Sequence, residues 1–247
     1  MRTAIRRTMR RILRAVRRIR TLIQGDPRRD IAATYLKGSG IEIGALHNPL
    51  MVPAQVEVRY VDRMSVEDLR RHYPELEFEP LTTVDIIDDG ERLSSLNEST
   101  QDFVIANHFL EHCENPLGAL QNMIRVLKPG GVLCVAVPDK RFTFDRERPV
   151  TPFEHLSKDY VEGPEQSRRQ HYEEWVEYFE KKTDRGEIEG RAEELMGQGY
   201  SIHFHVWTPT ELLELFSKLG TLPGVRTDLE LFLENKEEVI VVARKGS

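Results

Sequence analysis

Hydrophobic residues in the first 25 positions recur three and four residues apart, and arginines fill most of the positions between them. This spacing predicts an amphipathic helix with one apolar and one basic face, which Gly25 and Pro27 bring to an end. No apolar core follows the charged residues, so the segment is not a secretory signal peptide. The apolar positions are Ile5, Met9, Ile12, Leu13, Val16, Ile19 and Ile23.

From residue 38 onward, short runs rich in valine and isoleucine alternate with stretches of helical period. This alternation predicts an α/β fold in which helices flank a mostly parallel sheet. Only a short link joins the last two runs, so we expect them to form a hairpin that supplies an antiparallel edge strand. The seven predicted strands cover 40–44, 56–61, 82–87, 102–106, 131–137, 225–232 and 238–243.

Three helices are predicted between these strands. The first begins after Ser65, because Asp68 stands three residues later in capping-box position. The second covers 117–127 and ends where a Pro-Gly-Gly turn at 128–131 forbids continuation. The third covers 209–219, with a proline at its first position.

Residues 139–205 interrupt the alternation of strands and helices. The segment is polar, and its helical periods lie at 165–183 and 187–196. We therefore expect a helical insertion after the fifth strand. The predicted organisation is a basic amphipathic helix over 1–30, followed by one domain over 31–247 that contains this insertion.

Charge is unevenly distributed along the chain. Residues 1–30 hold eleven arginines and two aspartates, a net charge of +9, whereas the whole chain carries −6. The remainder therefore carries −15, and an acidic body of this kind repels nucleic acid. The arm at 1–25 suits self-association, packing on its own domain, or peripheral contact with an anionic membrane.

The two cysteines and the lengths of the apolar runs bear on the cellular compartment. Cys113 and Cys134 stand 21 residues apart with no zinc-ligand spacing, so we expect reduced thiols rather than a disulfide. No apolar run is long enough to cross a bilayer. We expect a cytoplasmic protein, with attachment to the periphery of the inner membrane as an alternative.

Small and acidic residues stand where the predicted strands end. Gly44 closes the first strand, and Asp62 closes the second, 20 positions after Glu42. In a nucleoside-binding α/β fold, a carboxylate at this place accepts hydrogen bonds from ribose hydroxyls. The third strand ends in the acidic pair Asp88 and Asp89 with a glycine after it, where a carboxylate can meet a purine amino group; solvated acids of a turn are the alternative.

The run "DFVIANHFLEHCENPLGALQNMIRVLKPGGVLCVAVPDKR" resembles class I S-adenosylmethionine-dependent methyltransferases, especially the large type 11 group related to quinone biosynthesis. The stretch "HVWTP" followed by "ELLELF" is similar to the approach to that family's last helix. The resemblance covers roughly 38–138 and 203–243, and it implies a Rossmann-like fold and S-adenosylmethionine as cofactor. "IEIGALHNPL", "VRYVDR" and "PDKRFTFDRERPVTPFEHL" also resemble bacterial methyltransferases found alongside glycosyltransferases, which implies sugar or polysaccharide acceptors.

The resemblance assigns roles by position. Glu42 and Gly44 match the first cofactor motif, Asp62 the ribose-binding acid, and Asp89 the adenine-side motif. Asn107 and the residue after it match the segment beside the methionine part of the cofactor. The residues expected at the cofactor are Glu42, Gly44, Ala45, Leu46, Asn48, Asp62, Arg63, Asp88, Asp89, Gly90, Asn107 and His108.

The first loop departs from the family pattern. Leu46 and Asn48 replace the later glycines, and only eleven residues separate Gly44 from the second strand, with Pro49 and Pro53 among them. A typical helix of about 11–12 residues does not fit there. We therefore predict no full helix at 47–55, and we expect amides and side chains of the 45–50 loop to hold the methionine carboxylate.

Histidines are the candidates for handling the proton of a methyl acceptor. His108 stands at the end of the fourth strand and ranks first as base or positioning group, and His155 at the start of the insertion ranks second. His203 and His205 would share one face of a strand, a geometry that suits a metal with Asp139 or Asp145. Such pairs more often pack and form hydrogen bonds, so no metal site is predicted.

The insertion has the composition of an acceptor-binding lid. Aromatic rings can stack on sugars or flat rings, and arginines can bind phosphate or carboxylate. A solvated helical cap with no acceptor role is the alternative. The side chains concerned are Lys140, Arg141, Arg146, Arg148, Arg168, Arg169, Phe142, Phe144, Tyr160, Tyr172 and Trp175.

Three functions remain open from the sequence. The leading hypothesis is O-methylation of a sugar, a nucleotide-linked sugar or a surface polysaccharide. The second is methylation of a small lipid-like metabolite at a membrane, which the basic arm would suit. The third is a methyltransferase-like module without catalysis that binds partners in glycan assembly, which the altered loop after Gly44 keeps open.

Overall fold

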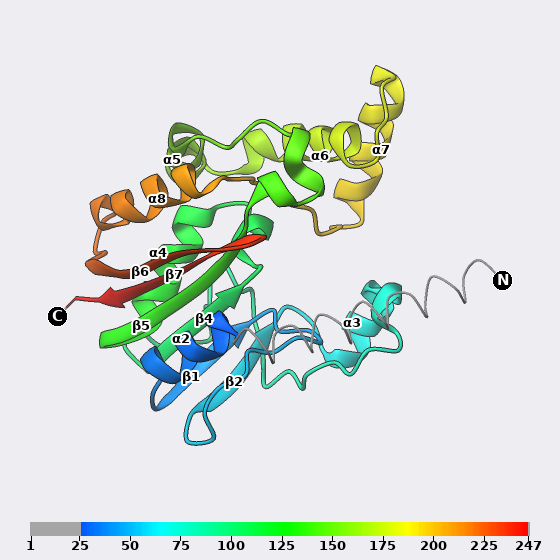
Figure 1. The fold of residues 1–247 in the computed structure, drawn as a ribbon. Coiled ribbons are helices and arrows are strands. Elements are labelled where there is room, and N and C mark those ends of the chain that lie inside the picture. Colours follow the sequence, from blue (N-terminus) through cyan, green and yellow to red (C-terminus); the bar gives the residue numbers. More distant parts are fainter. Residues whose placement is uncertain (1–25, 247) are drawn as a thin grey trace.

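A seven-stranded sheet forms the centre of the computed structural model, which describes residues 26–246 (Figure 1). The strand order is β3-β2-β1-β4-β5-β7-β6, with β7 antiparallel to both of its neighbours. The mostly parallel sheet and the hairpin at its edge are confirmed, with β7 next to β5 and β6 outermost. The strands are β1 (Ser39–Ile43), β2 (Glu57–Asp62), β3 (Ile86–Ile87), β4 (Gln101–Asn107), β5 (Leu127–Pro138), β6 (Thr227–Asn235) and β7 (Glu238–Lys245).

The helices begin at recognisable caps. Ser65 accepts a hydrogen bond from the backbone of Asp68 at the start of α3, as predicted. At α8, Thr208 and Glu211 form a complete capping box. The helices are α2 (Pro27–Tyr35), α3 (Val66–His72), α4 (Pro116–Val126), α5 (Phe153–Glu162), α6 (Glu165–Tyr178), α7 (Arg185–Gly197) and α8 (Pro209–Lys218).

Two elements at the start of the fold differ from the sequence prediction. The strand expected at 82–87 is only two residues long, because the chain before it forms isolated backbone hydrogen bonds such as Thr82 N to Leu46 O. Helix α2 was not predicted, since Pro27 marks the end of the preceding pattern. Pro27 is in fact the first residue of α2, and Asp26 caps that helix. The amphipathic helix predicted before Gly25 lies outside the described residues.

Two later elements differ in length. The strand expected at 131–137 already begins at Leu127, directly after α4. The helix expected over 165–183 ends at Tyr178, and Lys181 takes a left-handed backbone conformation (φ 59°) that is incompatible with a continuing helix.

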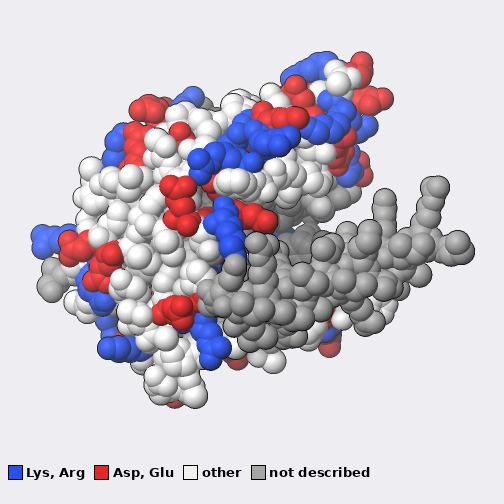
Figure 2. Space-filling view, viewed as in Figure 1, with Lys and Arg blue, Asp and Glu red and all other residues white. Residues whose placement is uncertain are grey.

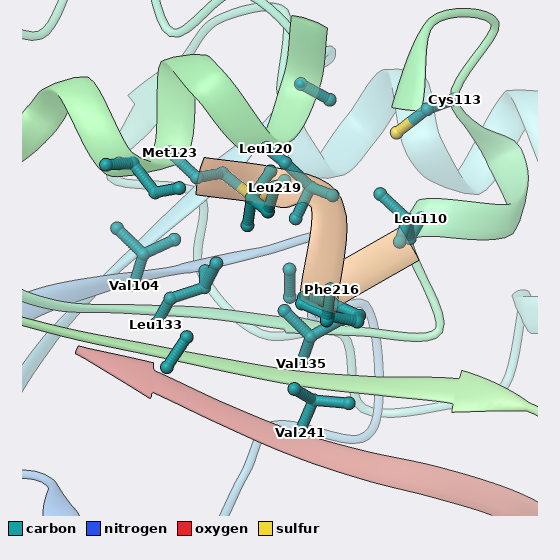
Figure 3. Close-up of a cluster of buried hydrophobic side chains, with 14 of the residues drawn as sticks. Val104, Leu110, Cys113, Leu120, Met123, Leu133, Val135, Phe216, Leu219 and Val241 are labelled. Carbon is teal, nitrogen blue, oxygen red and sulfur yellow. The ribbon is translucent and has the colours of Figure 1, made fainter. Parts of the chain in front are cut away.

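The two faces of the sheet carry different layers. Helices α4 and α8 pack on one face, and Figure 3 shows Leu120 and Met123 of α4 above Val104, Leu133 and Val135 of the strands. On the other face, α2 and the loop between β1 and β2 cover a smaller cluster. Side chains along β4 alternate between these clusters, as expected for a strand buried on both sides.

The predicted insertion over 139–205 forms a separate layer above the carboxyl-end region of β5 (Figure 1). The two ends of the insertion lie side by side, joined by an isolated parallel β-bridge between Asp139 and Trp207. Helices α6 and α7 build a small core of their own. This core contains Tyr172, Trp175, Val176, Ile188, Ala192, Leu195, Ile202 and Phe204. Among the described residues, no helix is long and apolar enough to cross a membrane.

Candidate functional site

The carboxyl ends of β1, β2, β3 and β4 bring together the residues predicted at the cofactor. Gly44 N donates to Val61 O, and Asp88 N donates to Asp62 O. On the other side of β1, Asn107 ends β4 at the same edge of the sheet. In open α/β sheets, ligands bind at this edge where the strand order reverses. Here β1 stands at that reversal, between β2 and β4.

The loop after β1 contains turns and no helix between residues 47 and 55, as predicted. Glu42 holds this loop: its two carboxylate oxygens accept the N–H of Leu50 at 3.0 and 3.1 Å. Burial raises the pKa of Glu42 to about 7, against the opposing effects of Leu50 N–H and Arg28. Gly44 (φ 66°) and Leu46 (φ 48°) turn the backbone through left-handed conformations. Glu42, the acid of the first motif, therefore fixes the 45–50 loop through the backbone of Leu50.

Asp62 and Arg63 lie where β2 leads to α3. Asp62 Oδ1 accepts the backbone N–H of Arg63 at 2.7 Å, and burial raises the pKa of this carboxyl group. The guanidinium of Arg63 lies 2.8 Å from His72 and 3.0 Å from the hydroxyl of Tyr73. The turn thus presents a carboxylate at the strand end, while Arg63 is held by the end of α3.

Asp88 and Asp89, the acidic pair after β3, differ in their surroundings. Asp88 is fully engaged in its own turn: it accepts hydrogen bonds from the backbone of Asp89 and from both the backbone and hydroxyl of Ser95. Although burial acts to raise it, the pKa of Asp88 is lowered by these bonds. Asp89 is exposed. A Cβ on Gly90 would lie 2.6 Å from side-chain atoms of Ile43 and of Phe109, so a larger residue there would have to displace these side chains.

Asn107 and His108 end β4 beside residues that the sequence did not indicate. The amide nitrogen of Asn107 is buried without a hydrogen-bond partner. His108 has a left-handed backbone (φ 52°), and its Nε2 lies 2.9 Å from Glu238 at the start of β7. Arg28 of α2 forms an ion pair with Glu238 and also reaches His108 Nε2 at 2.6 Å.

His155, the second predicted catalytic residue, belongs to a separate cluster. Its Nε2 lies 3.0 Å from His171 Nε2 and 3.1 Å from Asp159 Oδ2. The ring of His205 packs against both imidazoles. Burial, with contributions from His155 and Arg148, lowers the pKa of His171 to about 3. His108 is not part of this group.

The expectation that His203 and His205 share a face is wrong, because residues 202–206 do not form a strand. His203 lies against Asp145 and against the ring of His112, whereas His205 joins the cluster around His171. The described chain therefore holds two groups with the composition of a metal site, one around each histidine.

Four of the arginines predicted to bind the acceptor form ion pairs, namely Arg141, Arg148, Arg168 and Arg169. Arg148 is buried against Asp145 and backbone carbonyls, and Arg141 is held by Asp139 and Glu234. In Figure 2, basic and acidic side chains are interleaved over the α6–α7 region at the top of the view. Because their guanidinium groups already bind carboxylates and carbonyl oxygens, the expected role of these arginines in binding phosphate is not favoured.

The edge of the sheet fits the cofactor implied by the resemblance. The orphaned buried amide of Asn107 is a hydrogen-bond donor that needs an acceptor, and Asp62 offers a carboxylate at the ribose position. The close approach of Gly90 to Ile43 and Phe109 keeps the backbone of β3's end near β1. Asn107 would hold the methionine part of the cofactor, Asp62 the ribose, and the backbone at Gly90 the adenine.

Comparisons with known proteins identify the family of the chain. A family model described as a methyltransferase domain matches residues 36–221. No curated protein matches the chain. Similar solved structures include a protein from Pyrococcus horikoshii OT3, at 17% identity and a TM-score of 0.48, covering 96% of this chain and 91% of that one. A SAM-dependent methyltransferase from Aquifex aeolicus matches at 16% identity and a TM-score of 0.43, covering 85% and 83%. One from Methanosarcina mazei matches at 15% identity and a TM-score of 0.44, covering 88% and 96%.

Proposed function

The chain belongs to the methyltransferase-domain family, and from this premise we propose that it uses S-adenosylmethionine as methyl donor and methylates a hydroxyl group of a saccharide. The observation that carries the proposal is the pairing of His108 with Glu238 at the end of β4. An exposed aromatic segment follows directly after β5, the neighbouring strand. The pairing supports a role for His108 as proton acceptor, and the exposed aromatic segment supports a saccharide as the acceptor.

The bound cofactor supplies an electrophilic methyl group, and the chain must align the acceptor with it and exclude water. Asp62 would accept the ribose hydroxyls, while the amide of Asn107 and the 45–50 loop would position the methionine end. These residues bind and orient; none of them removes a proton from the acceptor.

A hydroxyl acceptor has to lose its proton as the new O–C bond forms, and His108 is placed to take it. In the tautomer in which His108 Nε2–H donates to Glu238, the donor-only guanidinium of Arg28 bonds to Glu238 and not to Nε2, and Nδ1 is left as the basic atom. Burial acts to raise the pKa of Glu238, but His108 and Arg28 hold it down at about 2. Glu238 is therefore ionised at neutral pH, where it stabilises the imidazolium that His108 forms on accepting the proton.

The acceptor surface lies at the start of the insertion. Phe142 and Phe144 are 60% and 49% exposed although both are large and apolar. Phe144 packs edge-on against Trp175 and Phe179, which fixes its ring. Exposed, fixed aromatic rings offer sugars a stacking face. Because Arg141 is paired with Asp139 and Glu234, and Arg148 with Asp145, we favour an uncharged saccharide over a nucleotide-linked one.

The test is a set of methyl-transfer reactions with S-adenosylmethionine and matched acceptors. Neutral saccharides, their nucleotide-linked forms and lipid-like alcohols are compared by release of S-adenosylhomocysteine and by the mass gain of one methyl group. We expect methylated neutral saccharides. Phe142→Ala should raise the KM for the saccharide, whereas the control Phe78→Ala, which alters an exposed phenylalanine outside the insertion, should not.

Two results would contradict the proposal. If the lipid-like alcohols alone are methylated, the acceptor belongs to the second class considered from the sequence. If the protein binds neither S-adenosylmethionine nor S-adenosylhomocysteine in calorimetry, the chain is a binding module without catalysis.

A further inference from the structure

Three ionisable side chains form a group next to His108. Glu111 and His112 come from the short 3₁₀ helix after β4 (Leu110–His112), and His203 comes from the end of the insertion. One ligand atom from each of these three residues lies within 4.8 Å of the other two. Glu111 Oε1 also lies 3.6 Å from His108 Nδ1, so the group adjoins the proposed acceptor site.

The carboxylate of Glu111 is buried without a hydrogen-bond partner. Its side chain is 3% exposed, and neither of its two oxygens accepts a hydrogen bond. An ionised carboxylate in this state is strongly unfavourable unless a positive charge or a set of donors compensates it. Native proteins leave few such groups, and a bound ion is one way in which the buried charge can be compensated.

The two imidazoles are held by their outer nitrogens. His112 Nδ1 lies 2.8 Å from the carbonyl oxygen of Ile202, and His203 Nδ1 lies 2.6 Å from Asp145 Oδ2. Asp145 is fixed in turn by the buried guanidinium of Arg148 at 2.9 Å. With Nδ1–H donated to oxygen, Nε2 of each ring is the atom left to bind a ligand. Metal-binding histidines are oriented in this way, by a carbonyl or a carboxylate on the outer nitrogen.

We propose that Glu111, His112 and His203 bind one divalent transition-metal ion, of which zinc is the representative. Two imidazoles and one carboxylate are a donor set of catalytic zinc and related sites. Three protein ligands leave coordination positions open, whereas structural zinc sites are closed by four. The position beside His108 Nδ1 is where a small oxygen ligand would enter.

If the chain methylates a hydroxyl as proposed above, this ion has a defined task. An acceptor oxygen at the open position would lose its proton more readily, because the cation favours the deprotonated form. The O–H bond breaks and the proton passes to His108 Nδ1. The oxygen then forms its bond to the methyl carbon as the C–S bond breaks, and S-adenosylhomocysteine leaves. Metal binding itself does not depend on this step.

The neighbouring cluster of His155, His171 and His205 provides the matched control. All three of its candidate ligands are imidazoles, and two of them contact each other directly, with His155 Nε2 at 3.0 Å from His171 Nε2. The same nitrogen of His155 lies 3.1 Å from Asp159, so it is already engaged. Because this cluster is also largely buried, a change in it controls for general damage to the insertion.

The experiment uses the full-length, tag-free chain, stripped of metal by a chelator and titrated with Zn²⁺ in calorimetry without cofactor or acceptor. We expect one ion per chain. Glu111→Gln should weaken binding by about 100-fold or more, since loss of an outer-shell partner alone costs about 10- to 100-fold. His203→Gln should do the same, whereas His171→Gln should bind zinc like the wild type. Absence of zinc binding, equal binding by Glu111→Gln, or loss of zinc in His171→Gln would each overturn the proposal.

Thermal unfolding gives a second readout that a purely structural role of Glu111 would not reproduce. Without metal, Glu111→Gln should unfold at the same temperature as the wild type or above it, because the isosteric substitution removes a buried unpaired charge. Zinc should raise the Tm of the wild type and leave that of Glu111→Gln unchanged. A protein that binds zinc but methylates no saccharide would refute the proposed acceptor and leave the metal site standing.

Discussion

Glu238 lies 2.9 Å from the imidazole of His108, although 130 positions separate them in the chain. The contact follows from the antiparallel direction of β7. Its first residue, Glu238, pairs with Pro138 at the end of β5, and His108 N donates to Ala136 O on that same strand. An antiparallel strand beside β5 thus starts at the edge where the parallel strands end, and it delivers a carboxylate there.

Substitution of either partner should affect turnover more than cofactor binding. We expect His108→Ala to lower kcat by about 10²- to 10⁴-fold, which is the usual contribution of a general base. Glu238→Gln should lower kcat by about 10-fold or more, because the amide no longer stabilises the imidazolium. Initial rates and the Kd for S-adenosylmethionine check both. A Kd that rises in parallel with the loss of kcat would contradict the assignment of His108 to the acceptor.

Glu42 should make the stability of the fold depend on pH. Burial raises its pKa from an ordinary value of 4.5 to about 7 in the folded chain. Between these values the folded chain binds a proton that the unfolded chain does not, so the free energy of unfolding falls as the pH rises through this window. The loss amounts to about 3 kcal/mol and is complete above the upper pKa.

Glu42→Gln should remove this pH dependence, because an amide oxygen can still accept the N–H of Leu50 while carrying no charge. Urea unfolding at about pH 5 and about pH 8 measures the difference. Glu57→Gln, at an exposed glutamate on β2, serves as the control and should keep the wild-type slope. An unchanged slope in Glu42→Gln would mean that another group carries the titration.

Local signals explain what the sequence predicted well. Short runs of strand-forming residues identified all seven strands, and Ser65 identified the start of α3. The missing helix at 47–55 was predictable from chain length and from Pro49 and Pro53, both local properties. Pro27 was misleading because a proline both ends one helix and starts another; the preceding Asp26, an N-cap residue, carried the information.

The chemistry around His108 could not be predicted in the same way. Arg28 and Glu238 reach it only through the strand order, which places β7 next to β5. The alternation rule placed His203 and His205 on one face, but it holds only within a strand, and that segment forms none. Glu111 is a candidate ligand because its carboxylate is buried, and nothing in the sequence indicates that a polar residue after a strand will be buried.

Asp62 and Asp88 offer a matched pair for testing the cofactor site. Asp62→Ala should weaken the binding of S-adenosylmethionine by roughly 10- to 100-fold, equivalent to roughly 1–3 kcal/mol for lost hydrogen bonds to a charged group. Asp88→Asn should leave binding of the cofactor nearly unchanged and lower the Tm, because the carboxylate of Asp88 accepts hydrogen bonds from Ser95 and within its own turn. Calorimetry and thermal unfolding separate the two effects. Equal weakening by both variants would place Asp88 at the cofactor as well.

Asp145 should be the carboxylate on which the insertion depends most for stability. It pairs with the buried guanidinium of Arg148 at 2.9 Å and holds His203. Although burial acts to raise it, the pKa of Asp145 is lowered by His203 and Arg148, so the group is charged in the folded chain. Asp145→Asn leaves Arg148 buried without its closest counter-charge, and breaking a buried pair from one side costs about 3–5 kcal/mol.

Unfolding in urea measures this loss, which should exceed that of any exposed pair in the insertion. Glu147→Gln is the control, because Glu147 lies two residues away and forms an exposed pair with Lys181. Exposed pairs contribute little, so the control should unfold like the wild type. Equal stability of Asp145→Asn and Glu147→Gln would show that Glu174, 3.6 Å from Arg148, is enough to hold the guanidinium.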